Sequence, residues 1–158
     1  MIEKSPVASG IPFDPTGSAL TSVQVEAAIK EIAASVASGL QNYNVISTTA
    51  FTTSSTTDVL ITGFTITPVS GTWAVFYNAS SLQATNGANQ DCTIFKAGTA
   101  ITDSRRNQRG GAAGITMIMS TLTVSQFNGS QTCDVRVRTN TGSITINART
   151  LVLIRLGP

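Results

Sequence analysis

A cluster of arginines is the first part of the sequence that could do chemistry. Arg105, Arg106 and Arg109 lie in the glycine-rich stretch TDSRRNQRGGAAG, residues 102–114. Guanidinium groups donate paired hydrogen bonds, so such a loop could hold a phosphate or an anionic glycan. We predict an irregular, mobile and cationic loop and name the three arginines as a candidate ligand loop. The alternative, which we favour, is that the loop is only solvated.

The acidic residues offer a second possible chemistry, because two carboxylates can cleave a glycosidic bond. Four of the eight acids fall in the strand-rich part of the chain: Asp58, Asp91, Asp103 and Asp134. Nothing in their spacing brings two together, and the chain has no histidine to exchange protons near neutral pH. A GxSxG nucleophile motif and a P-loop are also missing. We therefore predict no catalytic residue, no cofactor and no enzymatic activity.

The two cysteines, Cys92 and Cys133, complete the set of reactive side chains. Without histidine or further cysteines they cannot form a zinc site of the Cys/His type, so we predict no metal. Each lies in a strand-like run, in phase with apolar residues that point inward. This phase favours two buried free thiols, and a single disulfide between them is the alternative.

The composition excludes some classes of binding partner. Only 11% of the 158 residues are charged and the net charge is +2, too little for a protein that neutralises a row of phosphates. No apolar run reaches the length of a membrane span, and the N-terminus lacks the pattern of a signal peptide. We expect no nucleic-acid partner, no membrane partner and synthesis in the cytoplasm.

Most of the chain is predicted to form β-strands, and these strands position the side chains named above. Short runs rich in β-branched and aromatic residues alternate with Gly, Asn, Ser or Pro clusters, which predicts a sandwich, jelly roll or barrel. The runs are residues 43–51, 57–67, 71–80, 91–98, 114–124, 131–139, 142–148 and 149–157. The run at 131–139 alternates apolar and charged residues, as expected of a strand with one wet face. The apolar run 151–154 predicts a strand covered on both faces, and glycine loops at 96–98 and 140–142 predict hairpins.

One helix precedes the strands. Pro6, Pro12 and Pro15 predict an extended arm over residues 1–20, followed by a helix over 21–39. The helix start is marked by a capping box, Thr21 with Gln24, and by a hydrophobic staple, Leu20 with Val25. Residues 40–158 form the predicted β domain.

The apolar residues of this helix have coiled-coil spacing. Val25, Ile29, Ile32 and Val36 repeat at intervals of four, three and four residues. Isoleucine at both an a and a d position favours three or more parallel helices, so we predict a trimer. The alternative is that the stripe packs on the domain that follows.

Two parts of the chain resemble known families. Residues 13–32, FDPTGSALTSVQVEAAIKEI, resemble the FDxTGxxLTxxxVQxAIxE-like segment of bacteriophage tail-fibre and other fibrous virion proteins. The matching positions are Phe13, Asp14, Thr16, Gly17, Leu20, Thr21, Val25, Ala28, Ile29 and Glu31, while the VQ pair stands at Val23-Gln24. Residues 44–157 resemble the trimeric jelly roll of the tumour-necrosis-factor and complement type in the order of their runs.

These resemblances imply a homotrimeric, non-enzymatic virion protein of a bacteriophage, either a capsid decoration or a head-fibre protein. The expected fold is mainly β, an antiparallel jelly-roll sandwich preceded by an extended arm and one short coiled-coil helix. Its partners would be its own copies, a major capsid or other virion protein, and a host surface glycan. It would reside on the virion surface. The alternative is a lectin-like, receptor-binding tip of a tail fibre.

Two sets of residues carry this expectation. The predicted trimer interface comprises Val25, Ile29, Ile32, Val36, Phe76, Leu153 and Ile154. The predicted capsid anchor comprises Ile2, Pro6, Val7, Ile11, Pro12 and Phe13.

Overall fold

The computed structural model describes residues 16, 25–39 and 41–157. It divides into two compact units at the boundary between residues 41 and 42. The predicted anchor residues, the capping box and Leu20 of the staple lie outside the described residues, so those predictions remain as they stand. Among the described residues, the helix is too short to cross a membrane.

The helix α1 runs from Val25 to Gly39. On its surface Glu26 and Lys30 form an ion pair of 2.8 Å at the i,i+4 spacing that supports helices. Three members of the predicted stripe are exposed in the single chain: Ile29 to 58%, Ile32 to 47% and Val36 to 56%. The three residues share one face of the helix, at the spacings of three and four residues that place side chains next to each other.

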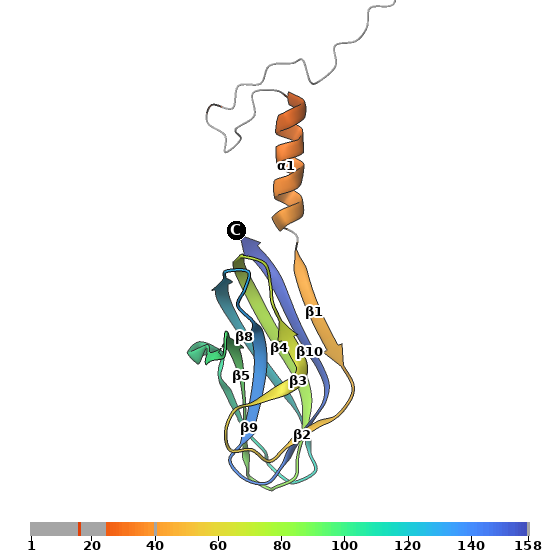
Figure 1. Cartoon of the computed structure of the whole chain (residues 1–158). Helices are drawn as coiled ribbons and strands as arrows, with labels where there is room; N and C mark the ends of the chain where they lie inside the picture. The colour runs from red at the N-terminus through yellow and green to blue at the C-terminus, as the bar shows by residue number, and fades with distance from the viewer. Residues whose placement is uncertain (1–15, 17–24, 40, 158) are drawn as a thin grey trace, which may run out of the picture. The chain divides into compact units, whose positions relative to one another are not determined.

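The strands form two antiparallel five-stranded sheets that stack as a sandwich (Figure 1). One sheet, here called the β10 sheet, has the order β1-β10-β4-β8, with β2 also paired to β10. Its strands are β1 (Asn42–Ser47), β2 (Phe51–Thr53), β4 (Gly71–Gln83), β8 (Thr116–Phe127) and β10 (Ile144–Gly157). Sequence and structure thus agree on a mainly β fold consistent with a jelly roll.

The other sheet, here called the β9 sheet, has the order β3-β9-β5-β6, with β7 also paired to β5. Its strands are β3 (Val59–Ile66), β5 (Asn89–Lys96), β6 (Thr99–Ala100), β7 (Arg106–Arg109) and β9 (Cys133–Thr139). A short 3₁₀ turn, η2 (Thr102–Ser104), links β6 to β7.

Each of the eight predicted runs contains a strand, but the connections differ at two places. Runs 142–148 and 149–157 are one strand, β10, whose pairing with β4 shifts register between Ile146 and Arg149. The predicted hairpin at 96–98 is confirmed, because Ala97 and Gly98 have φ of 48° and 78° between paired β5 and β6. The predicted hairpin at 140–142 is wrong, because β9 and β10 lie in different sheets and the loop crosses between them.

Aromatic rings fill the space between the two sheets. Tyr43 and Trp73 lie with ring centroids 5.2 Å apart, and the indole nitrogen of Trp73 donates to the Val69 carbonyl at 3.1 Å. Phe64 and Tyr77 meet edge to face at 6.3 Å. Such pairs contribute about 0.5–1.5 kcal/mol beyond their burial, so they help to fix how the sheets stack.

The two thiols also lie in this core. Cys92 and Cys133 are both fully buried and free, so the disulfide alternative is wrong. Burial is the main cause that raises the pKa of each thiol to about 12, and the neighbouring Asp91 and Asp134 add to the effect. Both sulfurs are therefore protonated near neutral pH and act as small apolar side chains.

The predicted mobile loop at 102–114 is largely ordered structure, which corrects that prediction. Its first half forms η2 and then β7, which pairs with β5 from Cys92↔Arg106 to Asn89↔Arg109. The buried Ser104 hydroxyl donates to the Ile101 carbonyl at 2.6 Å and accepts from the Ile94 amide at 2.9 Å. These bonds tie the turn to the edge of the sheet.

Candidate functional site

The outer face of the β10 sheet carries a patch of apolar side chains. Strand register aligns Val152 of β10 with Phe76 of β4, and Phe76 with Leu122 of β8. The next row on the same face aligns Ile154, Ala74 and Val124. We call these six residues the apolar patch; four of their side chains are 40–56% exposed.

The aligned strand positions of this outer face carry no charge, although Arg106 of β7 lines a hollow beside Phe76 and Leu122. Rows above and below the patch place only neutral residues on the same side of the sheet. The further positions are Asn42, Asn44, Ile46, Thr52, Thr116, Ile118, Ser120, Asn78, Ser80, Leu82, Thr145 and Thr150. Depletion of charge around apolar side chains is typical of the core of a protein interface.

The outer face of the β9 sheet has the opposite character. On β9 the inward side chains of Cys133, Val135 and Val137 are fully buried, which confirms the predicted alternation. Asp134, Arg136 and Arg138 alternate with them on the outer side, and Arg136 pairs with Asp134 at 2.9 Å. The two faces of one sandwich thus differ in the way expected if only the β9 face meets water.

The predicted interface residues of the β domain divide between patch and core. Phe76 and Ile154 belong to the apolar patch, with 40% and 45% of their surface exposed. Leu153 is corrected, because its side chain points into the sandwich and is fully buried. Its neighbour Val152 occupies the outward position instead.

Sequence reasoning missed the contribution of β8. Leu122 and Val124 face outward, whereas Thr121 and Thr123, which alternate with them, face inward and are buried. The inward threonines are held by hydrogen bonds, from Thr121 to the Ser104 carbonyl and from Thr123 to the Asp103 carboxylate at 3.4 Å. The sequence signal for these outward positions is the alternation of threonine with larger apolar residues in β8. By itself it suggests the opposite orientation, because the hydrogen-bond partners of the buried threonines are not visible in the sequence.

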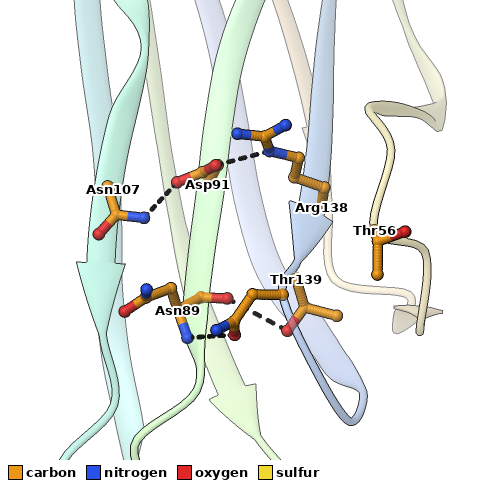
Figure 2. A pocket seen from close by; sticks show the side chains of 7 residues that line it. Thr56, Asn89, Asp91, Asn107, Arg138 and Thr139 are labelled. Carbon is orange, nitrogen blue, oxygen red and sulfur yellow. Dashed lines mark hydrogen bonds and ion pairs between the residues drawn. The ribbon is translucent and has the colours of Figure 1, made fainter.

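A second candidate site is a polar hollow of about 360 Å³ in the β9 sheet. It is lined by Thr56, Asn89, Asp91, Asn107, Arg138, Thr139 and Asn140. Figure 2 shows Asp91 of β5 between Asn107 of β7 and Arg138 of β9. The Arg138 Nε donates to one Asp91 oxygen at 2.6 Å, and the Asn107 amide donates to the other.

Ion pairs connect two residues that line this hollow, Asp91 and Arg138, to Asp58 and Arg105. Arg105 donates to Asp58 at 2.8 Å and lies 3.8 Å from the Asp91 carboxylate. Arg138 also approaches Asp58, at 3.9 Å. Two arginines and two aspartates therefore form one network with no net charge.

The three arginines of the predicted ligand loop do not converge on one point. Arg105 joins the ion network, Arg106 donates to the carbonyls of Asp103 and Arg105, and Arg109 donates to the Gly87 carbonyl at 3.3 Å. Each guanidinium thus has a partner within the chain, and the structure gives them no shared anion cradle. In the described part of the chain, no group of three His, Cys, Asp or Glu side chains is placed to hold a metal.

Comparison with solved structures places this sandwich beside two kinds of protein. The VP2 subviral particle of infectious bursal disease virus matches with a TM-score of 0.53 and 16% identity over 73% of this chain and 32% of that chain. Eiger TNF from S. frugiperda matches with a TM-score of 0.52 and 8% identity over 73% of this chain and 92% of that chain. No protein-family model and no curated protein matches the sequence.

These similarities show the fold. The chain spans about a third of the viral protein it matches and almost all of the TNF protein. Its β domain is therefore a jelly-roll sandwich similar to those of a viral-particle protein and of a TNF-like protein. At such identities the fold by itself fixes no activity.

Proposed function

We propose that this chain is a non-enzymatic structural protein of a bacteriophage virion, a homotrimeric capsid decoration or head-fibre protein. Residues 1–20 would anchor it on a major capsid or other virion protein, residues 21–39 would form a three-helix stem, and residues 40–158 would form the exposed head. It would reach the virion surface after synthesis in the host cytoplasm. The resemblance of residues 13–32 to fibrous phage proteins supports the phage setting.

The observation that carries the proposal is the apolar patch on the outer face of the β10 sheet, whose aligned positions carry no charge. A face that stays in water normally places charged residues at its outward positions, as the β9 face does. Here Phe76, Leu122 and Val124 are 40–56% exposed on a face with no charge at any aligned position. Burial against other copies would remove this apolar surface from water, which is the main favourable term in association.

The helix supplies a second, independent argument for self-association. Ile29, Ile32 and Val36 expose apolar surface along one stripe, with isoleucine at both seam positions. A helix of this length is marginal alone in water, so it needs neighbours. If the heads associate, the helices meet at high effective concentration, and two weak contacts reinforce one another.

The anchor residues extend this proposal to the partner on the shell. Ile2, Val7, Ile11 and Phe13 are apolar residues among prolines, a composition suited to an extended segment that lies along another protein. The capsid as partner is part of the proposal and rests on the phage resemblance.

Cryo-electron microscopy of the parent particle, together with mass determination of the purified protein, tests the proposal. We expect threefold knobs on the head and a solution mass of three subunits. Density at the tail tip would instead favour the receptor-binding alternative. A protein that is monomeric in solution and missing from purified virions would overturn the proposal.

A further inference from the structure

We infer that the polar hollow of the β9 sheet binds a neutral, hydroxyl-rich ligand, namely a saccharide unit. This site goes beyond the structural role proposed above and does not rest on it, because every lining residue belongs to one β domain. It also differs from the arginine loop, whose three guanidinium groups do not converge on one point.

Several lining residues have donor or acceptor groups that make no hydrogen bond within the described chain. Arg138 uses only its Nε within the described chain, so its two terminal nitrogens remain as donors. Asn107 gives its amide nitrogen to Asp91 and retains its oxygen as an acceptor. Asn140 accepts from the Asn89 backbone at 2.7 Å and retains its amide nitrogen as a donor.

Two more side chains add to this set. Asn89 and Thr56 make no side-chain hydrogen bond within the described chain, yet both line the hollow (Figure 2). The hollow thus presents donors and acceptors side by side. Neighbouring hydroxyl groups match such an arrangement because each one can donate and accept.

The charges around the hollow favour a neutral ligand. The positive charge of Arg138 is countered by Asp91 at 2.6 Å, and that of Arg105 by Asp58 at 2.8 Å. An anion would gain little from this balanced set and would face the free Asn107 oxygen. A cation would meet the guanidinium of Arg138.

The groups are also held in place before a ligand arrives. Asp91 is only 7% exposed and fixes both Asn107 and Arg138, while the buried Thr139 hydroxyl donates to the backbone of Asn89 and of Thr141. Preorganised groups lose little freedom on binding. No aromatic ring lines the hollow to stack on a sugar, so we expect millimolar affinity per site.

The test is titration of the intact protein with methyl glycosides of glucose, galactose, mannose and N-acetylglucosamine, followed by ¹H–¹⁵N NMR. The side-chain amides of Asn89, Asn107 and Asn140 give signals of their own in this spectrum. We expect at least one glycoside to shift these signals saturably, and inorganic phosphate to leave them in place.

A double variant, Asn89→Ala with Thr56→Val, removes two free polar groups without breaking a hydrogen bond within the described chain. It should raise the dissociation constant tenfold or more. Thr99→Val, in the same sheet but away from the hollow, is the matched control and should bind as the wild type does. The inference is overturned if no glycoside shifts the hollow, if only phosphate does, or if the double variant binds unchanged.

Discussion

Phe76 of β4 and Val152 of β10 stand directly opposite each other on the outer face of the β10 sheet, whose aligned positions carry no charge. Leu122 of β8 continues the same row. The three side chains come from strands far apart in the sequence, so the patch exists only in the folded sandwich. It is therefore the natural place to test self-association of the head.

If the heads form the proposed trimer, Phe76→Glu should convert it to monomers. The new carboxylate would be buried without a partner in the assembly, at a cost of several kcal/mol, whereas in the monomer it stays in water. Sedimentation velocity measures the change in mass. Thr99→Glu adds the same charge to the β9 sheet and should leave the trimer intact. A Phe76→Glu protein that is still trimeric would exclude the patch as the interface.

Ile29→Asp combined with Ile32→Asp should abolish association of the helices while the β domain stays folded. Two like charges on the apolar stripe would oppose helix pairing, and an unpaired helix of this length is marginal. Circular dichroism at 222 nm should lose most of its helical signal. Ala27→Asp with Ala34→Asp places the same charges on the far side of the helix. Equal losses in both pairs would mean that the stripe has no special role.

Asp91→Asn should lower the free energy of unfolding by about 1–3 kcal/mol, because a mostly buried carboxylate that accepts from Arg138 and Asn107 is lost. Urea unfolding followed by tryptophan fluorescence measures the change. Within the described residues the Asp103 carboxylate makes only long contacts of 3.4 and 3.5 Å, both to Thr123, so Asp103→Asn should cost less than about 0.5 kcal/mol. If both variants were equally stable, the ion network would not brace the β9 sheet.

The buried thiols predict loss of stability at alkaline pH. The pKa of Cys92 and of Cys133 is raised to about 12 in the fold, above about 8.5 for an exposed thiol. Below that lower value both states are protonated and the contribution is complete. As pH rises from there towards 12, the unfolded chain ionises first, so each thiol lowers the free energy of unfolding by up to about 1.4 kcal/mol per pH unit.

Urea unfolding at a series of pH values checks this slope. The double variant Cys92→Ala with Cys133→Ala should show a shallower fall between pH 9 and 12 than the wild type. An Ellman assay of the native wild-type protein at neutral pH should find both thiols unreactive. A rapid reaction of either thiol would contradict its burial.

Sequence patterns predicted the strands well because each strand follows local rules. The alternation of Val135 and Val137 with charged neighbours was sufficient to orient β9. The loop after β9 could not be assigned in this way, because a short glycine loop joins strands of one sheet or of two with equal ease. Only the position of β10 in the other sheet distinguishes these cases.

The candidate site was predictable only in part, for a similar reason. Phe76 and Ile154 could be named from their apolar character, but Leu153 was placed on the wrong face. The run Leu151–Ile154 has no polar residue to mark its phase. The polar hollow could not be predicted at all, because Asp91, Asn107 and Arg138 meet only through the pairing of β7, β5 and β9.

Strand β10 pairs with β1 from Asn42↔Ile154 onward, a contact between residues more than a hundred positions apart. It also pairs with β4, so it completes a sheet whose other strands are synthesised before it. Because the ribosome adds about 5–20 residues per second, β10 is synthesised several seconds after β1. The nascent chain must meanwhile keep an open strand edge from aggregating. Slow folding is the expected consequence of placing the central strand so late, because its contacts join residues distant in the sequence.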